Sequence, residues 1–111
     1  MEAHLKETAI VRQCLDYLAA RKIFAWRQNA AAVPLPGGGF RRFSGLRGVA
    51  DILGVLDKGR FLAVEVKSPK GKTSPEQDAF LDAVTALGGV ACVVHSVDEL
   101  EADLREAGVI S

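Results

Sequence analysis

The sequence lacks several features that would assign it to a specialised class of protein. Cys14 and Cys92 are its only cysteines, and both lie among apolar residues without CxxC or Cys/His spacing. This pattern argues against a disulfide or a zinc site, so we expect two reduced thiols in the core. No apolar run is long enough to cross a bilayer, and no basic, Ala-terminated leader is recognisable, so we expect a cytoplasmic protein without a membrane partner.

An overall excess of charge of one sign is also absent. The chain has 14 basic and 14 acidic residues, a balance that argues against a generally basic coat for nucleic acid. The distribution is uneven, because residues 41–72 hold eight basic groups against three acids, whereas residues 73–111 hold eight acids against Arg105 alone. Such a chain can present one positive face to phosphate, although ordinary solvated surface charges would give the same counts.

The length and the hydrophobic pattern predict one small domain of helices and strands. The 111 residues, 49% of them hydrophobic and 25% charged, suit a single domain over 1–111. Periodicity and turn residues predict the order αβββαβα. In chain order we expect a helix over 2–22, a strand over 23–33, a loop or flexible hairpin over 34–48, strands around 49–56 and 61–67, a helix that begins at 75 and stops at 88, a strand over 90–95, and a final helix from 97 to 107.

Local signals mark the later elements. Ser74 with Gln77, and Ser96 with Glu99, have the spacing of capping boxes that open helices. The run VACVVH at 90–95 is nearly unbroken in hydrophobicity, which is typical of a strand covered on both faces.

One acid shares the apolar stripe of the first helix. Glu7 precedes Ile10 and Val11 by one turn, so we expect it to face the sheet, where it could complete a metal shell directly or through water. The helix dipole alone would also favour an acid in a first turn. The stripe continues with Cys14, Tyr17 and Leu18.

The turn between the two central strands predicts which acids face each other. Asp57, Lys58 and Gly59 suit a three-residue loop, in which a type I turn is followed by a left-handed glycine. This loop length sets Asp51 opposite Glu65, with β-carbons about 5 Å apart. A two-residue turn at Lys58 and Gly59 would instead place the two acids on opposite faces.

Two adjacent carboxylates repel each other, so one is expected to take up a proton unless a cation lies between them. Their oxygens could form an open magnesium site, with ligand distances of about 2.0 Å, that leaves room for water and phosphate. Lys67 points the same way as Glu65 and could hold the attacking water or offset charge on phosphate. A plain ion pair between Glu65 and Lys67 is the alternative.

The residues that carry this chemistry occur in an order that resembles a known nuclease family. The matching pieces are Glu7, WRQN at 26–29, GVADIL at 48–53, VEVKSP at 64–69, and SPEQDAFLDAVTALGG followed by VACVV. The sequence resembles the virus-type replication-repair nuclease (VRR-NUC) domain of the PD-(D/E)XK superfamily over nearly the whole chain. This implies an α/β, restriction-endonuclease-like core, with a mixed central sheet of about four strands flanked by helices. Ala50 departs from the proline of the superfamily name, at a position that supplies no ligand.

The resemblance also implies roles for individual residues. Asp51, Glu65 and the carbonyl of Val66 would bind Mg²⁺ or Mn²⁺, and Glu7 would support a metal or its water. Lys67 would position the nucleophilic water.

Further candidates lie around this set. By the resemblance Gln77 would line the site, although it could only cap its own helix. Arg27 and Asn29 would touch the scissile phosphate or the DNA strand. The uneven charge adds candidate DNA contacts at Arg41, Arg42, Arg47, Lys70 and Lys72.

The implied activity is metal-dependent hydrolysis of DNA phosphodiesters. Stand-alone domains of this size in the family are associated with phages and bacteria and resemble Holliday junction resolvases, so branched DNA is the expected substrate by analogy. Symmetric cutting of a four-way junction needs two sites related by a two-fold axis, so we expect a homodimer. The alternative is a non-catalytic DNA-binding or assembly module that retains the nuclease fold.

A phosphate-binding loop for nucleotides is a weaker interpretation of VKSPKGKTS. Val66 stands where that motif requires its first glycine, and Pro69 removes an amide that would contact phosphate. We therefore expect no nucleotide cofactor.

Overall fold

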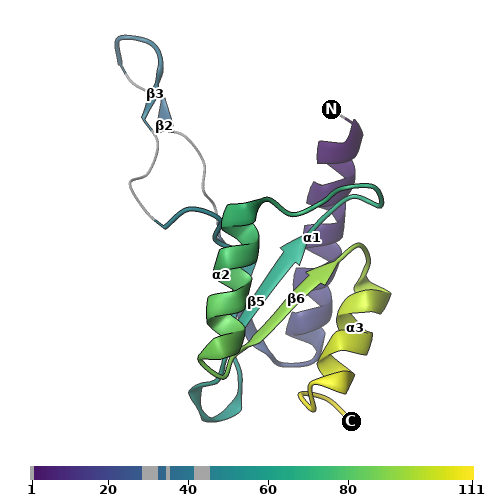
Figure 1. The fold of residues 1–111 in the computed structure, drawn as a ribbon. Helices are drawn as coiled ribbons and strands as arrows, with labels where there is room; N and C mark the ends of the chain where they lie inside the picture. Colours follow the sequence, from purple (N-terminus) through teal and green to yellow (C-terminus); the bar gives the residue numbers. More distant parts are fainter. Residues whose placement is uncertain (1, 29–32, 35, 42–45) are drawn as a thin grey trace.

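The computed structural model describes residues 2–28, 33–34, 36–41 and 46–111. A four-stranded sheet is flanked by helices, and a short two-stranded hairpin stands apart from it (Figure 1). The elements are α1 (Glu2–Ala20), β1 (Phe24–Arg27), β2 (Val33–Pro34), β3 (Phe40–Arg41), β4 (Ile52–Val55), the 3₁₀ turn η1 (Asp57–Gly59), β5 (Phe61–Val66), α2 (Pro75–Ala86), β6 (Val90–Val94) and α3 (Val97–Glu106). Apart from the β2–β3 hairpin, the predicted order αβββαβα is confirmed.

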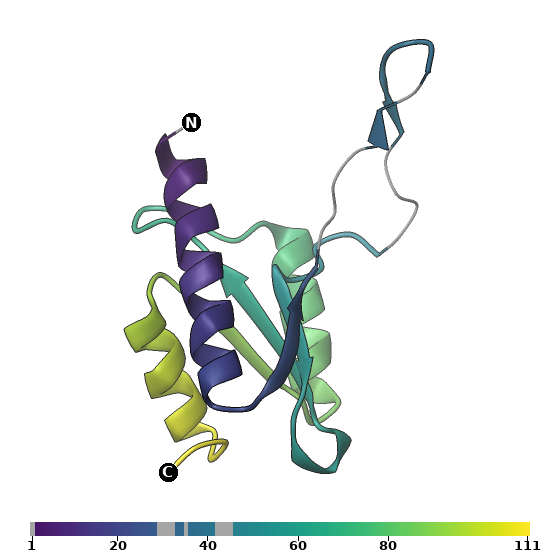
Figure 2. The same ribbon diagram turned by 180° about the vertical axis from the view of Figure 1, so that it is seen from behind.

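The sheet is mixed, with strand order β1-β4-β5-β6. β4 runs antiparallel to both β1 and β5, whereas β6 is parallel to β5. A parallel pair needs a crossover connection, and α2 provides it. α1 and α3 lie on one face of the sheet and α2 lies on the other (Figures 1 and 2).

The register of β4 and β5 confirms the predicted pairing of the two acids. Ile52 lies opposite Val64, and one step further along the same register Asp51 lies opposite Glu65. The predicted turn type is wrong in one respect, because Lys58 (φ 63°) lies in the left-handed region together with Gly59. Two consecutive left-handed residues, rather than one, let the chain reverse within three residues.

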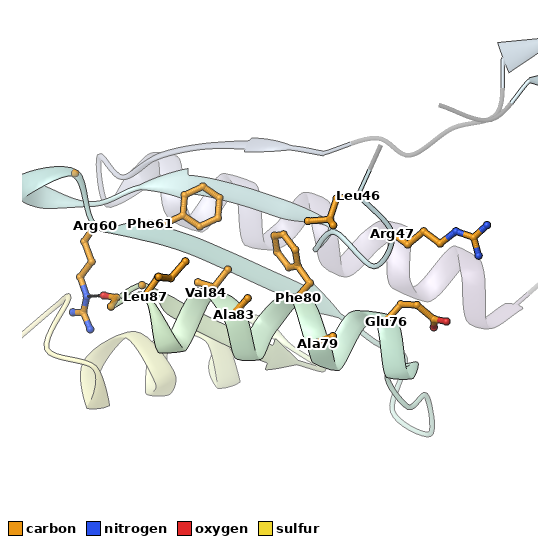
Figure 3. Close-up of a pocket in the computed structure, with 13 residues that line it drawn as sticks. Leu46, Arg47, Arg60, Phe61, Glu76, Ala79, Phe80, Ala83, Val84 and Leu87 are labelled. Atoms are coloured by element: carbon orange, nitrogen blue, oxygen red, sulfur yellow. Dashed lines mark hydrogen bonds between the residues drawn. The ribbon is translucent and has the colours of Figure 1, made fainter. Parts of the chain in front are cut away.

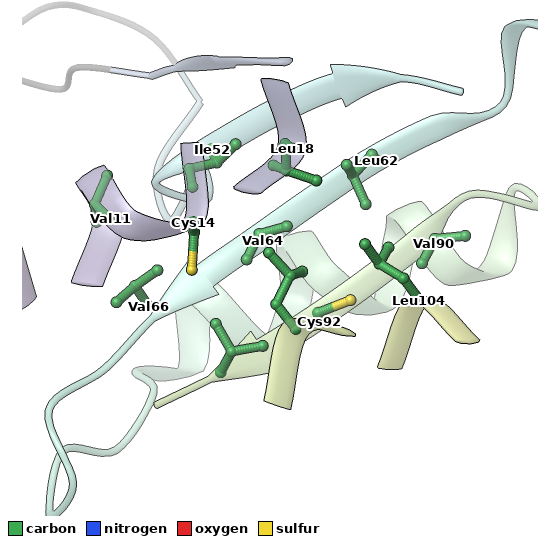
Figure 4. Close-up of a cluster of buried hydrophobic side chains, with 12 residues drawn as sticks. Val11, Cys14, Leu18, Ile52, Leu62, Val64, Val66, Val90, Cys92 and Leu104 are labelled. Carbon is green, nitrogen blue, oxygen red and sulfur yellow. The ribbon is translucent and has the colours of Figure 1, made fainter. Parts of the chain in front are cut away.

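Two apolar clusters hold the layers together. On the α2 side, Ala50 and Ala63 from the sheet pack with Leu81 and Val84 of the helix. The larger cluster lies on the opposite face, where residues of α1 and α3 meet the sheet (Figure 4). Its buried members are Val11, Cys14, Leu18, Ile52, Leu62, Val64, Val66, Val90, Cys92, Val94, Leu100 and Leu104. The apolar stripe predicted for the first helix is therefore confirmed, and so is the burial of both cysteines.

The helix starts agree with the sequence in one case and only partly in the other. Ser74 and Gln77 form the complete predicted capping box at α2. At α3, the Ser96 hydroxyl accepts a hydrogen bond from the backbone N–H of Glu99 (3.2 Å), but the Glu99 carboxylate contacts His95 Nδ1 (3.0 Å) instead of the cap. The His95 ring competes with the backbone N–H of Ser96 for the Glu99 carboxylate. Only the hydrogen bond from Glu99 N–H to the Ser96 hydroxyl is therefore formed, which is half of the predicted capping box.

β1 differs from its predicted length, and β6 differs from its predicted degree of burial. β1 is shorter than the expected 23–33, and residues 29–32 lie outside the described part of the chain. β6 is packed by α2 and α3 on opposite faces, as its apolar run predicts, but it lies at the sheet edge and Val93 remains 37% exposed. None of the described helices combines the length and apolar character needed to cross a membrane.

Candidate active site

Four elements meet at one end of the sheet. β5 ends there, β4 begins there, α2 begins there, and the first turns of α1 reach past the end of β5 (Figure 2). Because β4 and β5 are antiparallel and α2 follows β5 after a short loop, residues far apart in the sequence are brought to one place.

Asp51 is held from both sides immediately before β4. Its carboxylate oxygen Oδ2 accepts a hydrogen bond from the backbone N–H of Val66 (2.8 Å), and its backbone carbonyl accepts one from Gln28 (2.7 Å). The two contacts tie the residue to β5 and to the end of β1. In an extended strand the N–H and C=O of one residue lie on the same edge, so the Val66 carbonyl also lies on the Asp51 side.

Glu65 is the buried acid of the site. It is only 2% exposed, and within the described residues its Oε2 has no hydrogen-bond partner. The pKa of this carboxyl is raised from 4.5 to about 9, chiefly by burial and also by hydrogen bonding to Asp51 and by the charges of Asp51 and Glu7, whereas the charge of Lys67 acts in the opposite direction. A buried carboxyl oxygen without a partner is costly, and it marks the place where a proton or a cation is needed.

Glu7 and Lys67 lie beside this pair. The Glu7 carboxylate accepts a hydrogen bond from the backbone N–H of Ser68 (3.2 Å), so the first helix is attached just beyond β5. Lys67 is half-buried, and its backbone N–H donates to the carbonyl of Val94 (3.0 Å) in the neighbouring strand. The structure thus brings the three predicted acids and the lysine to one end of the sheet.

Gln77 is occupied by its helix cap. Its side-chain oxygen accepts a hydrogen bond from the backbone N–H of Ser74 (2.8 Å), which leaves its amide nitrogen to face other groups.

Gly48 shapes the backbone next to Asp51, although it was not among the residues predicted for the site. It has φ +79°, and a β-carbon at this position would lie 2.3 Å from the carbonyl of Glu76. The chain leading to Asp51 therefore contacts the first turn of α2 so closely that only glycine fits. The glycine directly before VAD was the available signal, since glycine is favoured where two backbones approach each other.

The structure describes the side chains of only some of the candidate DNA contacts. Arg27, Arg47, Lys70 and Lys72 are exposed, and Lys70 and Lys72 lie on the loop from the end of β5 to α2. Arg41 is described only as part of β3, and Asn29 and Arg42 lie outside the described residues.

The donor set suits a cation that keeps much of its water. No group of three or more His, Cys, Asp or Glu is arranged to hold a metal among the residues that the structure describes. Asp51 and Glu65, with the Val66 carbonyl on the same edge, nevertheless offer hard oxygen donors of the kind that magnesium and manganese prefer. The unpartnered Glu65 oxygen fits such an ion.

The fold and the acids at the end of β5 are consistent with a PD-(D/E)XK-like nuclease. Residues 5–98 match the VRR-NUC domain family. The chain therefore belongs to the VRR-NUC family of nucleases, as the resemblance implied. No curated protein and no solved structure matches it.

Proposed function

We propose that this protein is a magnesium- or manganese-dependent DNA endonuclease with its active site at the end of β5. The observation that carries the proposal is the buried, unpartnered oxygen of Glu65 next to Asp51. A divalent cation between the two would compensate both the burial and the repulsion of the carboxylates.

Asp51, Glu65 and the Val66 carbonyl are the proposed metal ligands. When bound, the ion would lower the pKa of the attacking water and offset charge that develops on the phosphate. Glu7 supports a water of the site from the side of α1, since the hydrogen bond that it accepts from the Ser68 N–H fixes its position.

Lys67 and Gln77 act on the substrate in this proposal. The Lys67 ammonium positions the nucleophilic water and stabilises charge on the phosphate oxygens. Attack in line with the leaving 3′ oxygen leaves a 5′ phosphate. The Gln77 amide nitrogen, which its cap does not use, lines the same space.

DNA would approach across the basic end of the molecule. Arg27 lies at the end of β1, next to Gln28, whose N–H donates to the Asp51 carbonyl, and in this proposal it touches the scissile strand. Lys70 and Lys72 flank the other side. The remaining proposed contacts are Asn29, Arg41, Arg42 and Arg47.

Branched DNA is the proposed substrate class, with a homodimer as the active form. One chain offers one site, and paired cuts across a junction require a second site related by symmetry. The activity would serve DNA replication or repair in the cytoplasm of a bacterium or a phage-infected cell, by a single domain over 1–111.

The alternative function is a non-catalytic DNA-binding or assembly module with a nuclease fold. A panel of radiolabelled four-way junction, flap, splayed-arm and duplex DNA, incubated with Mg²⁺, Mn²⁺ or EDTA, separates the two. The nuclease cuts only with metal, leaves 5′ phosphates and makes paired nicks across the junction. DNA that stays intact with both metals, while binding is equally tight in EDTA, would assign the alternative.

A further inference from the structure

The exposed large hydrophobic residues gather on one face of the molecule. Phe24, Trp26 and Val55 lie on the α2 side of the sheet, because their cross-strand partners Leu53 and Phe61 belong to the cluster under α2. Phe24 is 70% exposed, and its ring lies 5.5 Å from that of Trp26. Water therefore covers an apolar surface on this half of the sheet.

An apolar groove of about 810 Å³ lies on the same side, along α2 (Figure 3). Phe80, Val84 and Leu87 line it from the helix, and Leu46 and Phe61 line it from across the gap. Leu46 is 72% exposed and Leu87 is 89% exposed. A surface of this kind, large and contiguous, is typical of an interaction site.

α2 covers only half of this face of the sheet. α2 packs on β5 and β6, so the helix covers one half of the sheet, whereas the described residues place no helix over β1 and β4 on this side (Figures 1 and 2). Two strands span about 10 Å, which is the diameter of one helix with its side chains. The open half has room for one more helix next to α2.

We propose that a second copy of this chain covers this face, with its α2 lying over β1 and β4. A two-fold axis that runs along the helices satisfies both copies at once, because each α2 then fills the open half of the other sheet. The result is two sheets with a shared layer of two parallel helices between them. This inference rests on the proposed function and names the surface through which its two sites are joined.

Charge at the end of the groove favours self-association over a different partner. Arg47 and Glu76 both line the groove where α2 begins. With the axis along the helices, Arg47 of each copy meets Glu76 of the other, so the surface is complementary to itself. The same arrangement brings both β5 ends to one side of the dimer, where a single DNA junction can reach both sites.

Sedimentation velocity of the metal-free protein tests the surface without DNA. Wild type should be a dimer, and Leu87→Glu or Leu46→Glu should raise the dimer dissociation constant by about tenfold or more. Ala20→Glu is the control, because Ala20 is an exposed apolar residue at the end of α1, on the opposite face of the sheet. A monomeric wild type, or a dimer that the two groove variants leave unchanged, would overturn the inference.

A charge exchange tests the symmetry. Arg47→Glu and Glu76→Arg should each weaken the dimer, and the double variant should recover much of the wild-type affinity, because the two groups meet across the axis. A double variant no tighter than either single variant would refute the proposed axis. These readouts are independent of catalysis, so a dimer that fails to cut DNA refutes the nuclease, whereas an active monomer refutes only the interface.

Trp26 is the only tryptophan and reports directly on the covered face. Its emission should shift to shorter wavelength as the protein concentration rises through the dimer transition in the absence of DNA. Emission that is constant with protein concentration but quenched by single-stranded DNA would assign the face to base stacking and overturn the interface.

Discussion

The carboxylate of Asp51 accepts a hydrogen bond from the backbone N–H of Val66, the residue that directly follows Glu65 (2.8 Å). This bond fixes one acid of the site to the strand that carries the other. The distance between the two carboxyl groups is therefore set by the backbone of the sheet. A substitution of Asp51 that keeps the hydrogen bond from Val66 should remove the charge of the side chain without altering the fold.

Asp51→Asn should abolish DNA cleavage while leaving the protein folded. The amide oxygen can still accept from the Val66 N–H, but the negative charge needed for a divalent cation is lost, so we expect metal-dependent nicking to fall by about a hundredfold or more. Initial nicking rates at saturating Mg²⁺, with circular dichroism as the check on folding, measure this. Asp57→Asn, in the exposed turn at the other end of the sheet, is the matched control and should cut like wild type. Full activity in Asp51→Asn would refute the site.

Glu65 should make the stability of the metal-free protein depend on pH. Its pKa rises from 4.5 to about 9 on folding, so between these values the folded protein binds one more proton than the unfolded chain. The free energy of unfolding should therefore fall as the pH increases from 5 to 9. Urea titrations across this range measure the slope. Glu65→Gln should flatten it, and Mg²⁺ should stabilise wild type at pH 8 but not this variant. A slope that Glu65→Gln leaves unchanged would contradict the assignment.

Lys67→Ala should slow cleavage by orders of magnitude and leave DNA binding nearly unchanged. In the proposed mechanism the ammonium group acts on the water and on the phosphate, so its loss should appear in the single-turnover rate at saturating protein. Binding of the same DNA in Ca²⁺ serves as the comparison. Lys58→Ala, at the far turn, controls for the loss of one positive charge. Cleavage at the wild-type rate would refute the role of Lys67, whereas equal losses in both variants would indicate a general charge effect.

Gly48→Ala should destabilise the protein, because the new β-carbon would meet the Glu76 carbonyl at 2.3 Å and the residue would keep φ +79°. We expect a loss of about 3 kcal/mol from the free energy of unfolding. Gly59→Ala separates the two causes, since Gly59 has the same φ of +79° but nothing within 4 Å of its β-carbon. It should cost only about 1 kcal/mol. Equal losses in the two variants, from urea denaturation, would show that close contact at Gly48 contributes nothing.

The parts of the fold that were predictable depend on local chemistry. The length of the Asp57–Gly59 loop determines the pairing of Asp51 with Glu65, because side chains alternate between faces and each residue added to the turn changes the face. The Ser74 and Gln77 box needs only the four residues of its own turn. Such features can be predicted from the sequence because the residues that interact are close along the chain.

The parts that were missed depend on contacts between distant segments. Glu99 contacts His95 rather than its cap, a choice that depends on the ring position at the end of β6. The requirement for glycine at 48 appears only when Glu76 is placed beside it. The candidate ligands could be named from their pattern, but the unpartnered Glu65 oxygen could be recognised only after its surroundings had excluded water and other donors.

Glu7 and the Ser68 N–H are 61 residues apart in sequence, yet their bond connects the opening helix to the loop after β5. The candidate site can therefore form only after the chain from Glu7 to Ser68 has emerged and the first helix has docked on the sheet. A nascent or partly unravelled chain would carry its acids as separate, harmless groups, so the timing of folding itself protects DNA from a half-made nuclease.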